Sequence, residues 1–497
     1  MQNRLSVPRT ADLLCILPGA VAAAFMIGNH AMAWAPWIAV LFTLRFVRRT
    51  PAAQGLALGA CAWALAYVAG WQGVLPFKGW LSYAVPAAAG FAAFLPFIAD
   101  RLLSPRLGRS VRWVVLPTAW VAVEFAFSHL GYGTWGAVAY SQIALLPLLQ
   151  TAAVVGLAGP AFLVGAFGSI ANEVWQSPRR GWPLAAAFAG AVALILGGGW
   201  LLLRSTEPRA TVQIAGIVVD NMPVFRNTWG PLSYGEPLDR EAAERVRPSA
   251  RALVQALFDR SEQAADRGAR IIVWSEANAL IFASDEADMI HLGQSFAARR
   301  GVYLFMAAAV MTPGEPLAEN VIIVIDDRGR VVDRYLKSHP TPGEMSVRGD
   351  GRVRTLPTRY GRLAWAICYD FDYPGLIRQA GRAGADILID PSWEHAGMAP
   401  LHSQMAAMRA IETGAGLFRP VNGGLGLAVD GRGRVISALP ASRSLDEDLI
   451  ADMPIARTWA PQVAVGDAFA WACAALLMIL MIHAMRARRT RDQQSEA

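Results

Sequence analysis

Residues 184–203 read Leu-Ala-Ala-Ala-Phe-Ala-Gly-Ala-Val-Ala-Leu-Ile-Leu-Gly-Gly-Gly-Trp-Leu-Leu-Leu, twenty residues in a row without a charge. An α-helix rises about 1.5 Å per residue, so about twenty apolar residues cross the roughly 30 Å hydrocarbon core of a bilayer. The whole chain has the same character, because only 17% of its 497 residues are charged, against about 25% in soluble proteins. The sequence therefore predicts an integral membrane protein, and its apolar content excludes disorder, collagen and coiled coil.

Further apolar runs predict a multi-span α-helical membrane domain. We expect seven spans in residues 1–204, and an eighth span with a basic tail in residues 466–497. The expected spans are 13–28, 31–44, 55–75, 81–99, 113–128, 152–171, 184–203 and 468–485. A cleaved signal peptide is the alternative for the first span, but others follow directly and no convincing cleavage site is present, so we expect a retained helix.

Arginines lie in alternate connections between these spans. They are Arg4 and Arg9; Arg45, Arg48 and Arg49; Arg101, Arg106, Arg109 and Arg112; Arg179 and Arg180; and Arg486, Arg488, Arg489 and Arg491. The other short connections contain only Lys78. Because positively charged loops stay in the cytoplasm, we predict that both termini are cytoplasmic and that residues 205–465 are extracytoplasmic.

Two features of the membrane part suggest more than anchoring. Glu124 lies inside the fifth span, where a carboxylate is costly, and a structural and a functional role remain equally open. Residues 129–151 are uncharged, rich in glycine and aromatic residues, and too broken for a straight helix. They predict either a re-entrant segment or an interfacial loop on the outer face.

Residues 205–465 change character, because charges return and short β-rich runs alternate with helical stretches. The expected strands are 211–219, 270–274, 302–310, 321–326, 331–336, 362–367, 385–390 and 425–429, and the expected helices are 239–266, 285–299, 374–383 and 398–414. This pattern predicts one layered α/β domain. Residues 220–238 have turn chemistry without a clear period and predict a long exposed loop.

Cys368 is the only one of the four cysteines outside the predicted spans, so it has no disulfide partner within its domain. It ends the predicted strand 362–367 and precedes Tyr369, at a turn that exposes its side chain and frees backbone N–H groups for an oxyanion. A lone thiol in an oxidising compartment is a candidate nucleophile. A buried structural cysteine is the alternative.

Lys337 is one of only two lysines, and arginine fills every basic position except this one and Lys78. A compact ammonium differs from a guanidinium in shape and donor geometry, so its retention here indicates a functional role. Glu276 closes another strand, and Glu344 follows Pro342-Gly343. A carboxylate can take the proton of a thiol while an ammonium stabilises the tetrahedral intermediate.

The sequence gives little support for another kind of catalytic, phosphate-binding or metal site. The sequence contains no G-x-S-x-G, no H-E-x-x-H and no phosphate-binding loop. His339, His395 and His402 resemble a metal site only loosely, because no cysteine or carboxylate cluster completes one. We therefore expect no metal and no organic cofactor, and we interpret the arginine clusters as topology signals rather than nucleic-acid patches.

Glu276, Lys337 and Cys368, each at a strand end and in this order, resemble the triad of the nitrilase superfamily. With the membrane spans, the chain resembles the apolipoprotein N-acyltransferase family over nearly its full length. The matching motifs are Lys337 to Glu344, Ile367-Cys368-Tyr369, His402 to Glu412, Asn422-Gly423, Leu116-Pro117 with Trp120 and Glu124, Ala139 to Gln142, and Trp459 to Asp467. The resemblance implies an αββα sandwich, with Glu344 and Tyr369 supporting the triad.

The chain departs from that family at four places. Ser275-Glu276-Ala277 replaces Pro-Glu-Thr, Asp370 stands where a Glu usually follows Cys-Tyr, Asp390 to Trp393 replaces a Ser-Asn-Asp pattern, and 218–228 lacks the Gln-x-Asn start. The triad residues themselves are intact. These changes therefore concern the substrate pocket more than the chemistry, and a divergent member with another substrate is consistent with them.

The resemblance implies ping-pong acyl transfer in a bacterial inner membrane. Cys368 would take an acyl chain from a phospholipid and pass it to the N-terminal diacylglyceryl-cysteine of a lipoprotein, with Glu276 as base and Lys337 at the oxyanion. We expect a monomer. The alternatives are a membrane-tethered amidase that hydrolyses small C–N bonds, and a catalytically silent protein that binds lipids or lipoproteins.

Overall fold

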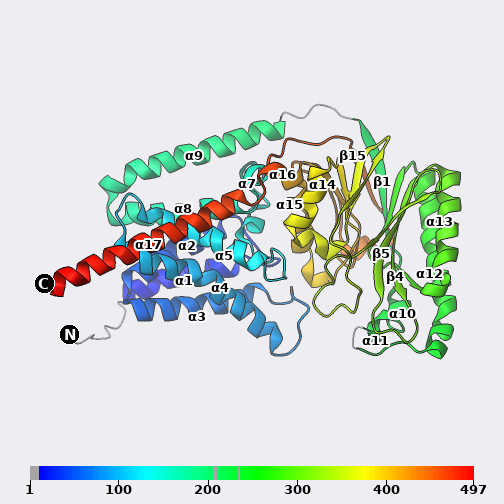
Figure 1. Cartoon of the computed structure of the whole chain (residues 1–497), viewed down its shortest axis with the longest axis horizontal. Helices are drawn as coiled ribbons and strands as arrows, with labels where there is room; N and C mark the ends of the chain where they lie inside the picture. Colours follow the sequence, from blue (N-terminus) through cyan, green and yellow to red (C-terminus); the bar gives the residue numbers. More distant parts are fainter. Residues whose placement is uncertain (1–9, 205–209, 233–234, 497) are drawn as a thin grey trace. The chain divides into compact units, whose positions relative to one another are not determined.

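The computed structural model describes residues 10–204, 210–232 and 235–496 (Figure 1). The chain divides into two compact units, a helical unit within residues 1–206 and 464–497 and a second unit within residues 207–463. Arg4 and Arg9, used above for orientation, lie outside the described residues. So does residue 205, where we expected the second domain to begin.

The helical unit has one longer helix at each of the eight predicted spans. These helices are α1 (Thr10–Ala24), α2 (Ala35–Arg49), α3 (Ala52–Gly70), α4 (Leu81–Leu103), α5 (Val115–Ser128), α8 (Ala158–Gln176), α9 (Pro178–Arg204) and α17 (Ala468–Glu496). Short helical pieces connect or extend them: η1 (Ser104–Arg106), η2 (Arg112–Val114), η3 (Val138–Gln142), α6 (Leu146–Leu149), α7 (Ala152–Val155) and α16 (Gln462–Val465).

Not all of these helices have the length of a full span. Among the described residues, four are long and apolar enough to cross a membrane: Ala52–Gly70, Leu81–Arg106, Pro178–Arg204 and Ala468–Arg486. By contrast, α1, α2 and α5 have 15, 15 and 14 residues. A helix of that size is about 22 Å long, short of the roughly 30 Å core. The eight-span topology therefore remains a prediction.

The predicted span 152–171 is wrong at its beginning. Gly156 has a φ of 63° and ends α7, because that backbone conformation breaks a helix and suits glycine. The chain bends by 117° between Leu146–Val155 and Ala158–Gln176, as in a broken span or a re-entrant loop. The segment before it consists of the short pieces η3, α6 and α7, as expected for a stretch too broken for a straight helix.

Glu124 fastens this broken segment to α5. Its Oε1 accepts hydrogen bonds from Trp120 Nε1, at 2.8 Å, and from the backbone N–H of Val138, at 2.9 Å. Val138 is the first residue of η3. The carboxylate therefore has a structural contact across the turn between α5 and η3. This contact is the structural role that was one of the two possibilities for Glu124.

Arg48 is a buried ion-pair partner as well as a charge at the end of α2. Its guanidinium lies 2.8 Å from Asp100 of α4 and 3.2 Å from Glu173 of α8, and its side chain is only 10% exposed. Breaking a buried pair is strongly destabilising. Arg48 therefore joins three helices of this unit near one end of α2.

The second unit contains two main β-sheets. The first has the order β15 (Leu449–Pro454), β1 (Thr211–Ile217), β2 (Ile271–Trp274), β4 (Tyr303–Met311), β5 (Glu319–Ile325) and β6 (Val331–Leu336), with β3 (Ala279–Phe282) paired to β4. The second has the order β14 (Val435–Leu439), β13 (Gly426–Val429), β11 (Gly416–Arg419), β9 (Ile387–Ile389), β8 (Gly361–Trp365) and β7 (Arg354–Thr358). A small third sheet pairs β10 (Ser392–Trp393) with β12 (Val421–Asn422).

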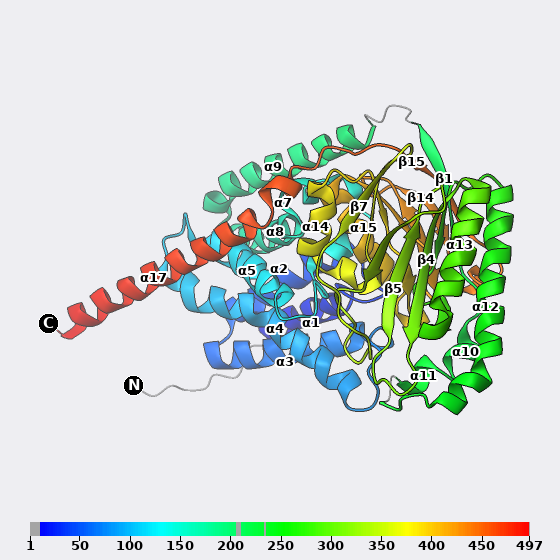
Figure 2. The same ribbon diagram turned by 45° about the vertical axis from the view of Figure 1, so that its right-hand side comes forward.

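These sheets form the two inner layers of an αββα sandwich, which confirms the predicted fold class. Phe305 of β4 and Leu417 of β11 belong to one buried core between the sheets. Helices α12 (Arg240–Asp266) and α13 (Glu286–Arg300) cover the first sheet, and α14 (Pro374–Arg382) and α15 (Leu401–Thr413) cover the second (Figures 1 and 2). All nine residues of β4 are buried, since both faces of its sheet are covered.

The prediction of a long exposed loop at 220–238 is wrong for much of that segment. The chain forms α10 (Met222–Phe225) and α11 (Trp229–Leu232) there. Val224, Trp229 and Leu232 are buried in an apolar cluster with residues of α12 and β3. The turn chemistry of the sequence hid these contacts, because the two helices are each a single turn and have no readable period.

Candidate active site

The three sequence-predicted catalytic residues follow the ends of three strands. Glu276 comes after β2 and Lys337 after β6 in the first sheet, whereas Cys368 comes after β8 in the second. Two non-glycine residues with positive φ stand at these ends, Ala277 and Cys368, both at 46°. Such backbone strain is typical of functional sites, where surrounding contacts hold it in place.

Lys337 is enclosed by two carboxylates. Its Nζ lies 2.7 Å from Glu276 Oε1 and 2.7 Å from Glu344 Oε2, and its side chain is 2% exposed. Thr341 and Ser346 donate further hydrogen bonds to Glu344. The structure therefore brings Glu276, Lys337 and Glu344 into direct contact.

Asn320 joins the two carboxylates from β5, and the sequence argument missed it. Its Nδ2 donates to Glu276 Oε1 at 2.8 Å and to Glu344 Oε1 at 3.0 Å. The side chain is fully buried. An amide that donates to both carboxylates offsets the excess negative charge around a single ammonium. An asparagine at the start of an apolar strand gives no sequence signal for this role.

The surroundings of Lys337 keep the ammonium charged. Burial by itself would lower the pKa of Lys337, but the carboxylates of Glu276 and Glu344 outweigh it and raise the pKa well above its ordinary value. Burial would likewise raise the pKa of Glu344, but Lys337 and Asn320 lower it to about 2. At neutral pH this pair is therefore an ammonium and a carboxylate, and neither group is poised to exchange a proton.

Cys368 is buried, at 3% exposure. Burial raises the pKa of its thiol well above the ordinary value, the Glu276 carboxylate adds to the rise, and the charges of Lys337 and Arg419 oppose it. The resting residue is therefore a thiol that needs a base to become a nucleophile. Its Sγ lies 3.7 Å from the carbonyl oxygen of Trp393.

Trp393 connects Cys368 with Glu276. Its backbone N–H donates to Glu276 Oε2 at 2.9 Å, while its carbonyl faces the Cys368 sulfur. Its ring contacts Phe225, with ring centroids 4.6 Å apart, and Trp229, at 5.9 Å. The departure at residues 390–393 therefore contacts the segment 220–238 through the Trp393 ring, while the Trp393 backbone contacts the Cys368 sulfur.

Asp370 links the lysine loop to the nucleophile turn. Its carboxylate accepts hydrogen bonds from Tyr335 Oη at 2.7 Å, from the His339 backbone at 2.8 Å and from His339 Nδ1 at 3.0 Å. It also accepts the Ile367 N–H, at 3.2 Å. The shorter side chain that departs from the family pattern is thus fully engaged, on both sides of the site.

Behind Cys368 lies a buried charge network. Arg419 binds both Asp390 and Glu394, and His402 binds Glu394 at 2.8 Å and Asp372 at 3.1 Å. Burial would lower the pKa of His402, but the carboxylates of Asp372 and Glu394 raise it to about 9, so the ring carries a charge at neutral pH. Neither Asp390 nor Arg419 was among the site residues predicted from the sequence.

The histidines weighed above as a metal site have other partners. His402 lies in the charge network and His339 on Asp370, while His395 Nδ1 accepts the N–H of Gly397. Across residues 10–204, 210–232 and 235–496, no group of three or more His, Cys, Asp or Glu side chains is arranged to hold a metal ion.

Tyr369, expected in a supporting role, is buried beside the nucleophile. Its ring packs edge-on against Tyr373, with centroids 5.5 Å apart. Burial and the nearby Asp372 carboxylate raise its pKa, so the phenol stays protonated. Its side chain therefore contributes packing and a neutral hydroxyl rather than a charge.

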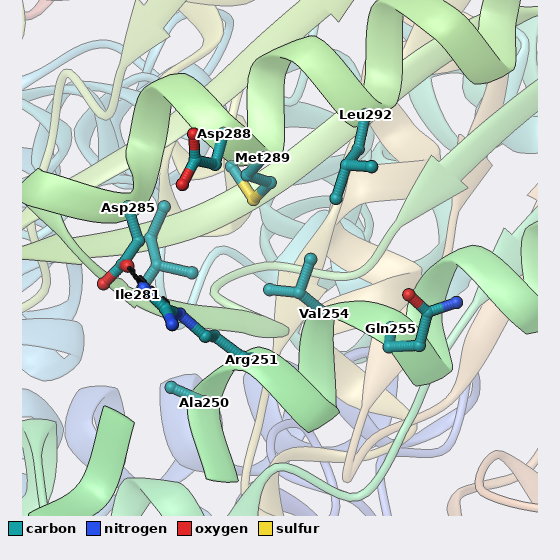
Figure 3. A pocket seen from close by; sticks show the side chains of 9 residues that line it. All are labelled: Ala250, Arg251, Val254, Gln255, Ile281, Asp285, Asp288, Met289 and Leu292. Atoms are coloured by element: carbon teal, nitrogen blue, oxygen red, sulfur yellow. Dashed lines mark hydrogen bonds and ion pairs between the residues drawn. The ribbon is translucent and has the colours of Figure 1, made fainter. Parts of the chain in front are cut away.

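A separate hollow lies between α12 and α13, on the outer side of the first sheet (Figure 3). Val254, Ile281 and Met289 form its apolar part, and Arg251 binds Asp285 across one end at 2.7 Å. None of the sequence-predicted site residues lines this hollow.

Comparison with known proteins first defines the class. The family model of the carbon-nitrogen hydrolase domain matches residues 242–446, which contain Glu276, Lys337, Glu344 and Cys368. The second unit is thus a nitrilase-superfamily domain. Among solved structures, an amidase from Nesterenkonia sp. is 19% identical, with a TM-score of 0.39 over 50% of this chain and 93% of its own.

Comparison of the helical unit then identifies the family within this class. The family model of the apolipoprotein N-acyltransferase N-terminal domain matches residues 19–170. The apolipoprotein N-acyltransferase of Geobacter metallireducens is 25% identical over 98% of this chain and 98% of its own length. That of Bradyrhizobium diazoefficiens is 29% identical over 82% of this chain and 79% of its own. This chain belongs to the apolipoprotein N-acyltransferase family.

Proposed function

We propose that this protein transfers a fatty acyl chain from a membrane phospholipid, through a thioester on Cys368, to the N-terminal diacylglyceryl-cysteine of lipoproteins. The relatives that match both units support the reaction. The observation that carries the assignment of residues is Lys337, buried between Glu276 and Glu344 and acting electrostatically on the Cys368 thiol.

The three charged residues take different roles. The raised pKa of Lys337 keeps it an ammonium, so it serves as a donor to negative oxygen and not as a base. The pKa of Glu344, at about 2, makes it a permanent counter-charge that orients Lys337. Glu276 is then the base. Its Oε2 accepts the backbone N–H of Trp393, and the carbonyl oxygen of the same residue contacts the Cys368 sulfur.

In the first step Glu276 takes the thiol proton, and the sulfur attacks an ester carbonyl of the phospholipid. The oxyanion forms beside the Lys337 ammonium. The N–H of Cys368 itself is bound to Asp390, so we assign the backbone contact to the next N–H, that of Tyr369. When the ester C–O bond breaks, Glu276 returns the proton to the leaving glycerol oxygen, which gives a lysophospholipid and the thioester.

In the second step the α-amino group of the acceptor attacks the thioester carbonyl. A C–N bond forms, the C–S bond breaks, and Glu276 moves the amine proton to the sulfur. Both substrates keep their acyl chains in a bilayer, which is a physical reason for joining this domain to membrane helices. The chemistry needs no metal and no organic cofactor.

We also propose that both termini face the cytoplasm of a bacterial inner membrane and that the sandwich lies on the other side. The alternating arginines support this orientation. It places the lone thiol of the domain in an oxidising compartment, where the absence of a second cysteine protects it from forming an intradomain disulfide.

The decisive test is intact-mass analysis of purified protein incubated with phospholipid. We expect a gain of one acyl chain that hydroxylamine removes, present in wild type and in Cys473→Ala and absent in Cys368→Ala. Cys473 is a matched control, because it is also a buried free cysteine but lies in α17. A folded wild-type protein without an adduct would overturn the proposal.

The second candidate is an amidase acting on small molecules, because residues 242–446 match the carbon-nitrogen hydrolase domain. The relatives that match both units do not favour it. It predicts turnover of small amides without a phospholipid adduct. A silent binding protein predicts neither reaction and a Cys368→Ala variant with the wild-type phenotype in cells. The mass experiment and an amide screen together separate the three.

A further inference from the structure

The backbone of the nucleophile is held in an unfavourable conformation. Cys368 has a φ of 46°, in the left-handed region that is unfavourable for any residue other than glycine. Such a conformation persists only where surrounding contacts hold it. The residue is the first of the short helical turn η5 (Cys368–Asp372), directly after β8 and Ala366-Ile367.

A carboxylate supplies that contact. Asp390 Oδ1 accepts the backbone N–H of Cys368 at 2.9 Å, and Asp390 is fully buried. Asp390 directly follows β9, the parallel neighbour of β8. A hydrogen bond between the ends of two adjacent strands is directional, so it fixes the plane of the peptide that begins Cys368.

Asp390 is itself held in place. Arg419 Nη1 binds its Oδ2, and Ser392 Oγ donates to its Oδ1 at 3.1 Å. Arg419 ends β11, the next strand along the sheet, and its other nitrogen binds Glu394 at 2.6 Å. The guanidinium is fully buried. With both oxygens engaged, the carboxylate has no free rotation about its side chain.

We propose that Asp390, fixed by Arg419, is a positioning residue that holds the backbone of Cys368 so that its thiol faces Glu276 and Lys337. It acts through the peptide of Cys368, whose N–H its Oδ1 accepts. This inference rests on the proposed function only in taking Cys368 as the nucleophile. It extends that proposal by naming what enforces the strained turn.

The test compares Asp390→Ala with Asp386→Ala in full-length protein. Asp386 is a matched control, because it precedes β9 and its carboxylate accepts the N–H of Arg362 at 2.7 Å, the same kind of bond at the other end of that strand. The first readout is the single-turnover rate of thioester formation against phospholipid concentration. For Asp390→Ala we expect the maximal rate to fall at least tenfold with the half-saturating concentration changed less than twofold, since a small misplacement of a nucleophile has costs of that order.

The second readout needs no substrate. Alkylation by iodoacetamide at pH 7 is followed on the Cys368 peptide, with an added cysteine-containing peptide as the internal standard. We expect Asp390→Ala to slow alkylation of Cys368 at least threefold, with the standard unchanged and with Asp386→Ala like wild type. A general loosening of the fold would instead expose the buried thiol and speed its alkylation.

Asp390→Asn keeps the shape and one acceptor oxygen for the Cys368 N–H. We expect it to fold and to retain a faster thioester-forming rate than Asp390→Ala, and it replaces that variant if the alanine protein does not fold. Rates within twofold of wild type in folded Asp390→Ala, or an Asn variant no faster than the alanine variant, would overturn the proposal. If wild type forms no thioester, the proposed function fails while the alkylation experiment still decides the role of Asp390.

Discussion

Asp370, two residues after Cys368, binds both the backbone N–H and the ring Nδ1 of His339, two residues after Lys337, at 2.8 and 3.0 Å. Because the lysine loop belongs to one sheet and the nucleophile turn to the other, this pair fixes the separation of ammonium and sulfur across the sandwich. The hydroxyl of Tyr335 adds a third contact to the same carboxylate, at 2.7 Å.

Asp370→Ala is therefore expected to lower acyl-transfer activity at least tenfold, since five donors lose their acceptor and the two loops are free to separate. Tyr335→Phe removes one of these contacts and should cost less than the alanine variant. The single-turnover thioester assay measures both. An Asp370→Ala protein that folds and keeps full activity would separate this carboxylate from the geometry of the site.

Lys337→Arg should abolish activity although it keeps the charge. The ammonium fits between two carboxylate oxygens, each 2.7 Å from Nζ, in a pocket that leaves 2% of the side chain exposed. A planar guanidinium is larger and has a different donor geometry. Lys78→Arg changes the only other lysine and should behave as wild type in the mass assay. Activity in a folded Lys337→Arg protein would remove this residue from the mechanism.

Glu344→Gln should reduce the loss of folding stability that accompanies a change from neutral to acid pH. The Glu344 pKa is lowered from 4.5 to about 2. A carboxyl whose pKa is lowered by folding stabilises the protein above its unfolded value, and the contribution disappears as the pH falls through the folded value. The stabilisation by Glu344 is thus lost between about pH 4.5 and pH 2. A pKa change of this size corresponds to about 3 kcal/mol of folding free energy.

The measurement is the melting temperature of detergent-purified protein at pH 7 and pH 3. The drop between the two should be smaller by several degrees in Glu344→Gln than in wild type. Glu319→Gln, which removes a half-exposed surface partner of Arg334, should show the wild-type drop. Equal drops in all three proteins would mean that Glu344 does not carry this ionic contact.

A reporter fused after Arg204, which ends α9, should report the extracytoplasmic side. A reporter after Arg49, at the end of α2, should report the cytoplasm. Both follow from the arginine distribution, because positively charged loops stay inside. A cytoplasmic signal from the first fusion would reverse the proposed orientation of the whole chain.

The sequence was informative about Glu276 and Cys368 because each follows a buried apolar strand, where a polar residue stands out, and about Lys337 because arginine fills every other basic position except Lys78. The eight predicted strands correspond to β1, β2, β4, β5, β6, β8, β9 and β13. Strands such as β11 and β14 were missed, because Gly416-Leu-Phe-Arg is short and begins with glycine, and Val435-Ile436 are exposed at an edge.

Some residues that surround the triad, such as Asn320 and Asp390, were not predicted from the sequence as site residues. Asn320 lies 44 residues from Glu276, and Asp390 lies 22 residues from the Cys368 N–H that it binds. Nothing near Asn320 in the sequence marks it, whereas Asp390 follows the buried strand β9. Only the order of strands in the sheets shows which groups the two residues bind. The beginning of the predicted span 152–171 was wrong for a local reason, the positive φ of Gly156 at the end of α7.

Glu124 offers a test of the membrane unit that is independent of catalysis. Glu124→Ala leaves Trp120 Nε1 and the Val138 N–H without their acceptor, and an unsatisfied buried donor costs about 1–3 kcal/mol. Glu124→Gln keeps an acceptor oxygen at the same place. We expect the alanine variant to melt several degrees below wild type in detergent and the glutamine variant to stay close to it. If both variants melt like wild type but lose acyl transfer, the carboxylate has the functional role that the sequence left open, and the contact with η3 is secondary.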